Sequence, residues 1–288
     1  MEIKIQKWRP LMKRQPVTRR SLLKTTAVGL SLAVAGLGHE PQPVLAQAGS
    51  TRTFVLAHGS WHGGWCWKRV ADRLRAKGHA VYTPSFTGMG DRIHLLNKEL
   101  SISTFVEDLV QVIISEELSE VVLVGHSFGG IPISGVADQI PDRIARLIYL
   151  DALIIESGRN AISYFPPDVE ARVKAAAKAT NGLAVPVPDQ LPAVWGLGKP
   201  GDPDYDWVRR RLAPHPFGTY TTTLTLHAKV GNNLPRTYVQ CTQPSYPILE
   251  DSRRLVRSWE GWQWVDLAAP HDSMITHPDA VVGLLLGA

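Results

Sequence analysis

A buried strand that leads through a glycine-flanked serine into a helix constrains the fold of this chain more than any other feature. Val121-Val122-Leu123-Val124 is a continuous apolar run, as expected of a strand covered on both sheet faces. Gly125-His126-Ser127-Phe128-Gly129 follows and fits the pattern G-x-S-x-G, and a helical segment continues to about Gln139. The flanking glycines permit a tight turn that lifts the hydroxyl of Ser127 out of the backbone. The pattern therefore predicts a nucleophilic serine at a strand–helix junction.

Strand and helix patterns alternate along most of the chain. The other predicted strands are Thr53–Ala57, Ala80–Tyr82, Leu147–Leu150, Thr237–Cys241 and Trp262–Val265. The other predicted helices are Trp65–Lys77 (closed by Gly78), a helix opened by the capping box Thr104–Glu107 and running through Ile114, Glu250–Trp259, and Pro278–Leu286. This alternation predicts an α/β fold, with a mostly parallel sheet of about six strands and helices on both faces.

Residues from about 155 to 234 interrupt the alternation. Ten of the 21 prolines lie in 155–235, among several aromatic residues. The aromatic content favours a lid inserted over a site, and the alternative is an irregular surface excursion. Two tryptophans of the insertion, Trp195 and Trp207, are predicted to contact substrate, and so is Trp61 in the loop after the first strand.

The loops that follow the predicted strands suggest which residues serve as the base and as the oxyanion donors. His271 lies in the loop after the last strand, which opens at the same carboxyl edge of a parallel sheet as Ser127. A nucleophilic serine needs such a base. The glycine-rich loop after the first strand can aim the backbone N–H of Ser60 at the site, and the N–H of Phe128 supplies a second donor.

A metal site is the alternative interpretation of His58 and His62, which are four residues apart. The surrounding glycines make a helix unfavourable there, and no Glu follows as in H-E-x-x-H. We therefore predict no metal at these histidines.

The first 48 residues differ from the rest. They carry eight Lys and Arg against two acids, so the remainder of the chain has a net charge of about −1 and offers no basic surface for nucleic acid. Arg19-Arg20-Ser21-Leu22-Leu23-Lys24 resembles a twin-arginine export signal, and Ala46-Gln47-Ala48 is a small-x-small cleavage site. Residues 1–48 are thus predicted to be a signal peptide read by the twin-arginine export machinery. The mature domain (49–288) would be periplasmic or secreted, without stable membrane insertion; an uncut N-terminal anchor is the alternative.

Three segments carry a family resemblance. The segment HGSWHGGWCW (His58–Trp67), the elbow GHSFGG and the segment PHDSM together resemble the α/β-hydrolase superfamily. The similarity is greatest to the branch of plant methylesterases, hydroxynitrile lyases and related bacterial carboxylesterases, and it covers residues 53 to 288. It implies a helical lid, no cofactor, and main-chain oxyanion donors at Ser60 and Phe128. It also implies cleavage of a carboxylic ester, which the apolar insertion suggests is lipophilic, through an acyl-enzyme.

The third member of the catalytic triad, the acid that orients the histidine, is not at the family's usual position. The place where the family usually carries it reads Thr242-Gln243-Pro244, without a carboxylate. We place the acid at Asp151, directly after the strand Leu147–Leu150, where some haloalkane dehalogenases of the superfamily similarly carry theirs. The alternatives are Glu250 and Asp251, eight or more residues past the later strand, or a role of Asp151 only as a cap of the following turn.

Two other functions remain open at this level. Hydroxynitrile lyases of this branch carry a lysine after the catalytic histidine and a threonine in the oxyanion loop, where this chain has Asp272 and Gly59. A non-catalytic binding protein on the same scaffold is the other alternative. Cys66 and Cys241 fall on separate elements and are predicted to be buried, inert thiols instead of a disulfide. The protein is expected to be a monomer or dimer.

Overall fold

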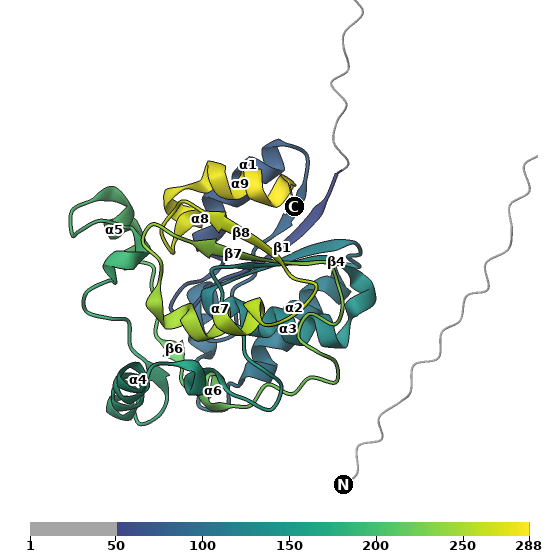
Figure 1. Ribbon diagram of the computed structural model, residues 1–288. Helices are drawn as coiled ribbons and strands as arrows, with labels where there is room; N and C mark the ends of the chain where they lie inside the picture. The colour runs from purple at the N-terminus through teal and green to yellow at the C-terminus, as the bar shows by residue number, and fades with distance from the viewer. Residues whose placement is uncertain (1–50, 288) are drawn as a thin grey trace, which may run out of the picture. The chain divides into compact units, whose positions relative to one another are not determined.

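The computed structural model describes residues 51–287, and a six-stranded sheet forms the centre of this part of the chain (Figure 1). Its strands are β1 (Thr53–Ala57), β2 (Ala80–Tyr82), β3 (Val121–His126), β4 (Ile144–Leu150), β7 (Arg236–Cys241) and β8 (Gln263–Leu267). They are ordered β2-β1-β3-β4-β7-β8, and every neighbouring pair is parallel. The predicted fold class is therefore confirmed.

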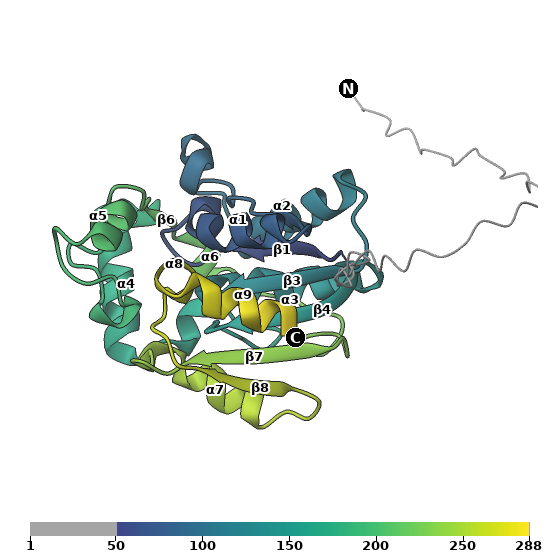
Figure 2. The same ribbon diagram turned by 90° about the horizontal axis from the view of Figure 1, so that it is seen from above.

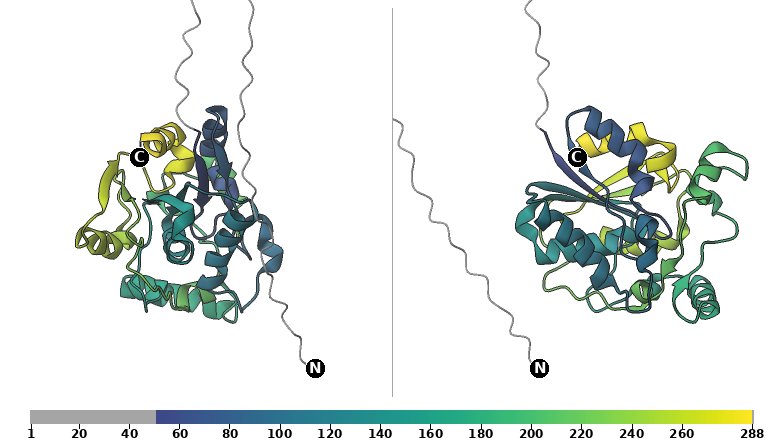
Figure 3. Two further views of the ribbon diagram at one scale, coloured as in Figure 1. Left: turned by 90° about the vertical axis from the view of Figure 1, so that its right-hand side faces the viewer. Right: turned by 180° about the vertical axis from the view of Figure 1, so that it is seen from behind.

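Helices cover both faces of the sheet. They are α1 (Lys68–Ala76), α2 (Ile102–Ser115), α3 (Gly130–Gln139), α7 (Glu250–Arg257), α8 (Ser273–Thr276) and α9 (Pro278–Gly287). Short 3-10 helices are η1 (Gly64–Trp67), η2 (Gly90–Leu95), η3 (Ser127–Gly129), η4 (Pro141–Arg143) and η7 (Pro247–Leu249). Helices α1, α8 and α9 lie on one face, and α2, α3 and α7 lie on the other (Figures 1 and 3).

Successive side chains of β1 enter two separate cores. Phe54 and Leu56 pack with residues of α1 and α9, whereas Val55 and Ala57 pack with residues of α2 and α3. All four are fully buried. Because strand side chains alternate between faces, an uninterrupted apolar strand serves both cores at once. Burial of each larger side chain stabilises the fold by about 1.5–3 kcal/mol.

Two predicted helices begin differently from expectation. Helix α2 is capped by Ser101, whose hydroxyl accepts the N–H of Thr104 while the Thr104 hydroxyl accepts the N–H of Ser101. The capping box predicted at Thr104–Glu107 was therefore placed three residues too late, because a threonine can serve as the third residue of such a box. The segment predicted as one helix from Trp65 divides into η1 and α1, and it ends as predicted at Gly78, with φ +88°.

The insertion between β4 and β7 lies beyond the carboxyl ends of the strands (Figure 2). It contains η5 (Ala161–Tyr164), α4 (Pro167–Ala179), β5 (Ala184–Val185), η6 (Ala193–Trp195), α5 (Pro203–Arg209), β6 (His215–Pro216) and α6 (Gly218–Thr221). Strands β5 and β6 pair antiparallel as a small second sheet, which the sequence did not predict. The insertion is thus placed over the sheet edge where the candidate catalytic residues lie.

Residues 1–48, with the predicted signal peptide and its cleavage site, lie outside the described residues. Within residues 51–287 no helix is both long and apolar enough to cross a bilayer.

Candidate active site

Ser127 lies at a sharp turn between β3 and η3. Its φ is +52°, a left-handed conformation that is uncommon for a residue with a side chain. A Cβ on Gly125 would come within 2.5 Å of the carbonyl oxygen of Gly129, and one on Gly129 would come within 2.8 Å of the carbonyl oxygen of His58. The two glycines are therefore required by close backbone approach on either side of the serine.

His271 reaches Ser127 from the loop between β8 and α8. Its Nε2 lies 3.0 Å from the Ser127 Oγ, and the imidazole is almost fully buried. The backbone N–H of His271 donates to the carbonyl of Val194 in the insertion, and its carbonyl accepts from His126 Nε2 at 3.0 Å. The loop is thus anchored from both the insertion and β3.

Asp151 completes the chain of hydrogen bonds from the end of β4. Its Oδ2 accepts from His271 Nδ1 at 2.7 Å, and the residue is fully buried with φ +40°. With Nδ1 protonated, Nε2 of the neutral ring is free to accept the hydroxyl proton of Ser127. The structure therefore brings together the three residues that the sequence analysis selected as nucleophile, base and acid.

A buried arginine that the sequence analysis missed supports Asp151. Arg253 Nη2 donates to the Asp151 Oδ1 at 2.9 Å, and the N–H of Cys241 donates to the same oxygen at 3.2 Å. Burial opposes ionisation of Asp151, but its bonds and charge interactions with His271 and Arg253 outweigh that effect and lower its pKa. The carboxylate is thus held ionised and in a fixed orientation.

The rival carboxylates Glu250 and Asp251 face solvent. Their side chains are 49% and 50% exposed, and they pair with Arg253 and Arg254 on α7. Neither has a contact with His271, in agreement with the choice of Asp151 over them.

The loop after β1 is fixed around Ser60 by two histidines and a tyrosine. His58 Nδ1 donates to the Gly59 carbonyl at 2.8 Å, which orients the peptide that bears the Ser60 N–H. His62 Nδ1 donates to the Ser60 carbonyl at 2.7 Å, and Tyr220 Oη donates to the Ser60 Oγ at 2.7 Å. The rigid peptide is what an oxyanion donor requires.

Most ring nitrogens that might ligate a metal make other hydrogen bonds, although His62 Nε2 and His126 Nδ1 do not. His58 Nε2 accepts from the Phe86 N–H, so both of its nitrogens are used. Among the described residues, His126, His271 and Asp272 could approach a metal, but His126 Nε2 donates to a carbonyl and both nitrogens of His271 belong to the Ser127–Asp151 chain. This geometry does not favour a metal centre.

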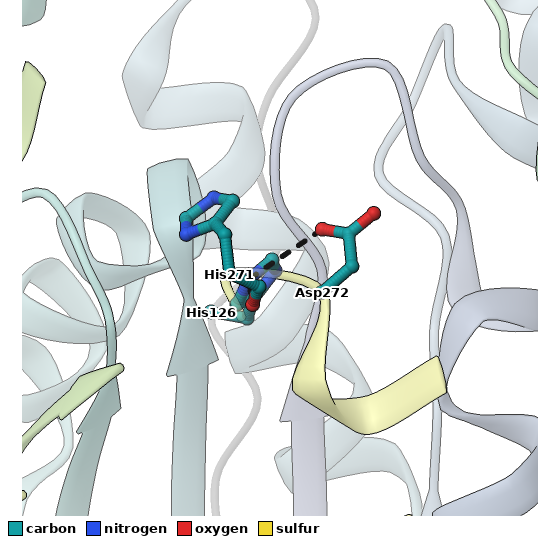
Figure 4. Close-up of side chains that lie close together, drawn as sticks. All are labelled: His126, His271 and Asp272. Atoms are coloured by element: carbon teal, nitrogen blue, oxygen red, sulfur yellow. Dashed lines mark hydrogen bonds and ion pairs between the residues drawn. The ribbon is translucent and has the colours of Figure 1, made fainter. Parts of the chain in front are cut away.

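Asp272 is a second buried carboxylate next to the base. Figure 4 shows Asp272 beside His126 and His271, and its Oδ1 lies 4.0 Å from His126 Nε2. Its closest nitrogen partner is His62 Nε2, at 3.3 Å. In the sequence alone, Asp272 is distinguished only as a departure from the hydroxynitrile lyases, which carry a lysine at this position.

A cavity of about 350 Å³ opens at Ser127. Ser60 and Phe128 line it beside His271, as do Trp61 and Trp195. Apolar and aromatic residues that were not predicted from the sequence also line it, among them Phe165, Val169, Val173, Ala176, Tyr220, Tyr246 and Ile248. The cavity wall is therefore mostly apolar and aromatic, and its polar residues are those around Ser127 together with Arg172 on α4.

Trp207 is a correction to the sequence-based prediction, because it does not line this cavity. Its ring packs edge-on against Trp65, with centroids 5.2 Å apart, and between Arg69 and Arg211. The composition of the insertion shows that it is rich in aromatic residues, but only the tertiary structure shows which tryptophan side chain lines the cavity.

Cys66 and Cys241 are both buried and unpaired, which confirms the prediction of two free thiols. Burial raises the pKa of both thiols, so neither has the thiolate character of a reactive cysteine.

Comparison with known proteins identifies the family. The model of the alpha/beta hydrolase family matches residues 54–284, so this chain belongs to that family. The chain is 37% identical over 235 residues to a carbendazim hydrolyzing esterase of Nocardioides sp. (strain SG-4G). The aligned region covers 78% of this chain and 95% of the relative. It is 32% identical over 115 residues to methylesterase 4 of Arabidopsis thaliana, covering 39% of this chain and 43% of the relative.

A solved structure shares the same fold. An extracellular alpha/beta-hydrolase from a Paenibacillus species superposes with a TM-score of 0.70 and 24% identity, covering 82% of this chain and 98% of the other.

Proposed function

We propose that this protein is a serine esterase that cleaves lipophilic carboxylic esters through an acyl-enzyme. The observation that carries the proposal is the unbroken chain of hydrogen bonds from the Ser127 Oγ through His271 to Asp151, at 3.0 and 2.7 Å, opening on an apolar cavity. The esterases among its relatives support the same reaction.

The geometry assigns a role to each group. His271 Nε2 takes the hydroxyl proton as the Ser127 Oγ bonds to the ester carbonyl carbon, and the backbone N–H groups of Ser60 and Phe128 stabilise the resulting oxyanion. The bond from carbon to the alcohol oxygen then breaks, and His271 returns its proton to the leaving alcohol. Water attacks the acyl-enzyme with His271 again as base, and the carboxylic acid leaves.

The walls of the cavity suggest the substrate class. Trp61, Trp195 and the apolar face of α4 offer contact area and few hydrogen-bonding groups. A substrate with a sizeable apolar acyl or alcohol group gains binding energy there, because its apolar surface leaves water.

Export belongs to the same proposal. We infer that the twin-arginine machinery exports the folded domain and that residues 1–48 are then removed, so that a monomeric or dimeric enzyme acts in the periplasm or outside the cell. The arginine pair and the small-x-small site support this.

Replacement of the nucleophile tests the reaction. Ser127→Ala should lower kcat on p-nitrophenyl esters by about 10⁴-fold or more, while a small rate from binding and the oxyanion donors survives. A fluorophosphonate should label the natural protein and leave the variant unlabelled. If the natural protein neither hydrolyses esters of any chain length nor takes the label, it is a binding protein on a hydrolase scaffold.

A further inference from the structure

Burial of the Asp272 carboxylate costs free energy, and the roles of Ser127, His271 and Asp151 do not account for it. It is fully buried directly after His271, and within residues 51–287 neither carboxylate oxygen has a well-aligned hydrogen bond. The closest nitrogen is His62 Nε2, at 3.3 Å. A buried, incompletely satisfied carboxylate is unfavourable unless a charge faces it.

His62 provides that charge and connects it to the oxyanion loop. A backbone carbonyl can only accept, so the contact of 2.7 Å between His62 Nδ1 and the Ser60 carbonyl places a proton on Nδ1. Burial opposes protonation of the second nitrogen, but the negative charge of Asp272, 3.3 Å away, outweighs burial and raises the pKa of His62. The pKa of Asp272 is lowered in turn, so both shifts favour the charged pair.

Two histidines and a thiol next to the pair are neutral. Burial lowers the pKa of both His58 and His126 to about 3, so both rings are neutral. Burial also keeps the thiol of Cys66 protonated, because it raises its pKa. His271 bonds to Ser127 and Asp151, and its charge interaction with Asp272 further lowers the pKa of that carboxyl.

We propose that Asp272 and His62 are positioning residues that tie the loop of the catalytic base to the loop of the oxyanion donor. Asp272 lies on the loop of His271, and His62 lies two residues from Ser60 and holds its carbonyl. The tie fixes the Ser60 N–H relative to the Ser127–His271 pair. This inference rests on the proposed esterase function.

Both residues border the cavity at Ser127, yet almost none of their surface is open to it. Asp272 and His62 are 0% and 2% exposed, and the ring of Trp195 packs over His62 with centroids 5.4 Å apart. Their effect therefore belongs to the transition state, through the placement of the Ser60 N–H, and not to substrate binding.

The test uses Asp272→Asn, His62→Gln and the double variant. Each single variant should lower kcat about 10- to 100-fold, with KM changed less than about threefold, because a donor displaced by a fraction of an ångström stabilises the oxyanion poorly. Binding of a trifluoromethyl ketone, which mimics the tetrahedral intermediate, should weaken by the same factor. The double variant should be no slower than the slower single variant, since both changes break one connection.

Controls separate a positioning role from a structural one. Asp138→Asn removes another aspartate–histidine contact, the pair Asp138–His227 at 2.9 Å, and should leave kcat unchanged. All kcat values are taken on the pH plateau of each variant, so that a changed titration of the base is not mistaken for a displaced donor. If Asp272→Asn does not fold, His62→Gln alone carries the test.

Three outcomes overturn the proposal. They are unchanged kcat in the single variants, a rise in KM at constant kcat, and multiplicative losses in the double variant. If the natural protein is active and Ser127→Ala is not, such an outcome removes the positioning role and leaves the esterase function standing. If the natural protein and Ser127→Ala are equally inactive, the esterase function itself fails.

Discussion

At the scale of single residues, the proposed acid Asp151 is held by more than its hydrogen bond to His271. One oxygen of Asp151 faces His271, and the other accepts from Arg253 and from the N–H of Cys241. Arg253 is only 1% exposed although it follows two solvent-facing acids on α7. No local pattern distinguishes it, because its burial depends on how α7 packs across the end of β4.

Replacement of the acid gives the sharpest residue-scale prediction. Asp151→Asn should preserve the fold and lower kcat by up to about 10⁴-fold, because an amide can hold the wrong tautomer of the imidazole and cannot neutralise its charge. Steady-state kinetics and a melting curve measure the two effects.

Glu250→Gln and Asp251→Asn are the matched controls and should be nearly silent, since both side chains are about half exposed. An active Asp151→Asn enzyme, together with an inactive variant at either control position, would move the acid to the later strand.

At the scale of elements, the insertion contributes the cavity wall and also supports the catalytic loop. Val169, Val173 and Ala176 recur at helical spacing on α4 and line the cavity. The carbonyls of Val194 and Trp195 accept the N–H groups of His271 and Asp272. The same segment thus shapes the pocket and holds the base.

The two tryptophans of the insertion should therefore behave differently. Trp195→Ala enlarges the pocket and should shift preference toward longer p-nitrophenyl esters, by about 1–3 kcal/mol in kcat/KM for each altered apolar contact. Trp207→Ala loses its contacts with Trp65, Arg69 and Arg211 and should lower the melting temperature at unchanged preference. Equal losses on every ester for Trp195→Ala would give that residue a purely structural role.

At the scale of the whole molecule, buried histidines link folding to pH. Burial lowers the pKa of His58 and His126 to about 3 and that of His215 well below its usual value. The unfolded chain binds protons at these residues below about pH 6.5, and the folded protein does not.

The free energy of unfolding should therefore fall as the pH falls from about 6.5 toward 4, by about 1.4 kcal/mol per pH unit for each of these histidines. Urea unfolding at several pH values measures the slope. His215→Gln should reduce the slope by about a third, and a stability that stays flat between pH 7 and 5 would contradict buried, neutral rings.

The export proposal is also a property of the whole chain. Arg19→Lys together with Arg20→Lys should leave the precursor inside the cell, because the paired arginines are the feature that the machinery reads. Fractionation and immunoblotting measure it. Unchanged mature protein outside the cytoplasm would exclude the twin-arginine route.

The sequence by itself determined the sheet, the serine turn and the position of the base. These follow from local causes: buried strands are continuously apolar, only glycine fits at positions 125 and 129, and parallel strands all deliver the loops that follow them to one edge of the sheet. Even the unusual position of Asp151 could be predicted, because it directly ends a recognisable strand.

Only the tertiary structure decided what depends on contacts between distant segments. Arg253 contacts Asp151 although the two are 102 residues apart in the sequence. His62 and Asp272 likewise come from loops near opposite ends of the described sequence. Trp195 turns inward and Trp207 outward because η6 packs beside the His271 loop while α5 packs toward α1. Such contacts cannot be predicted from a sequence pattern, because each depends on how whole helices, strands and loops pack together.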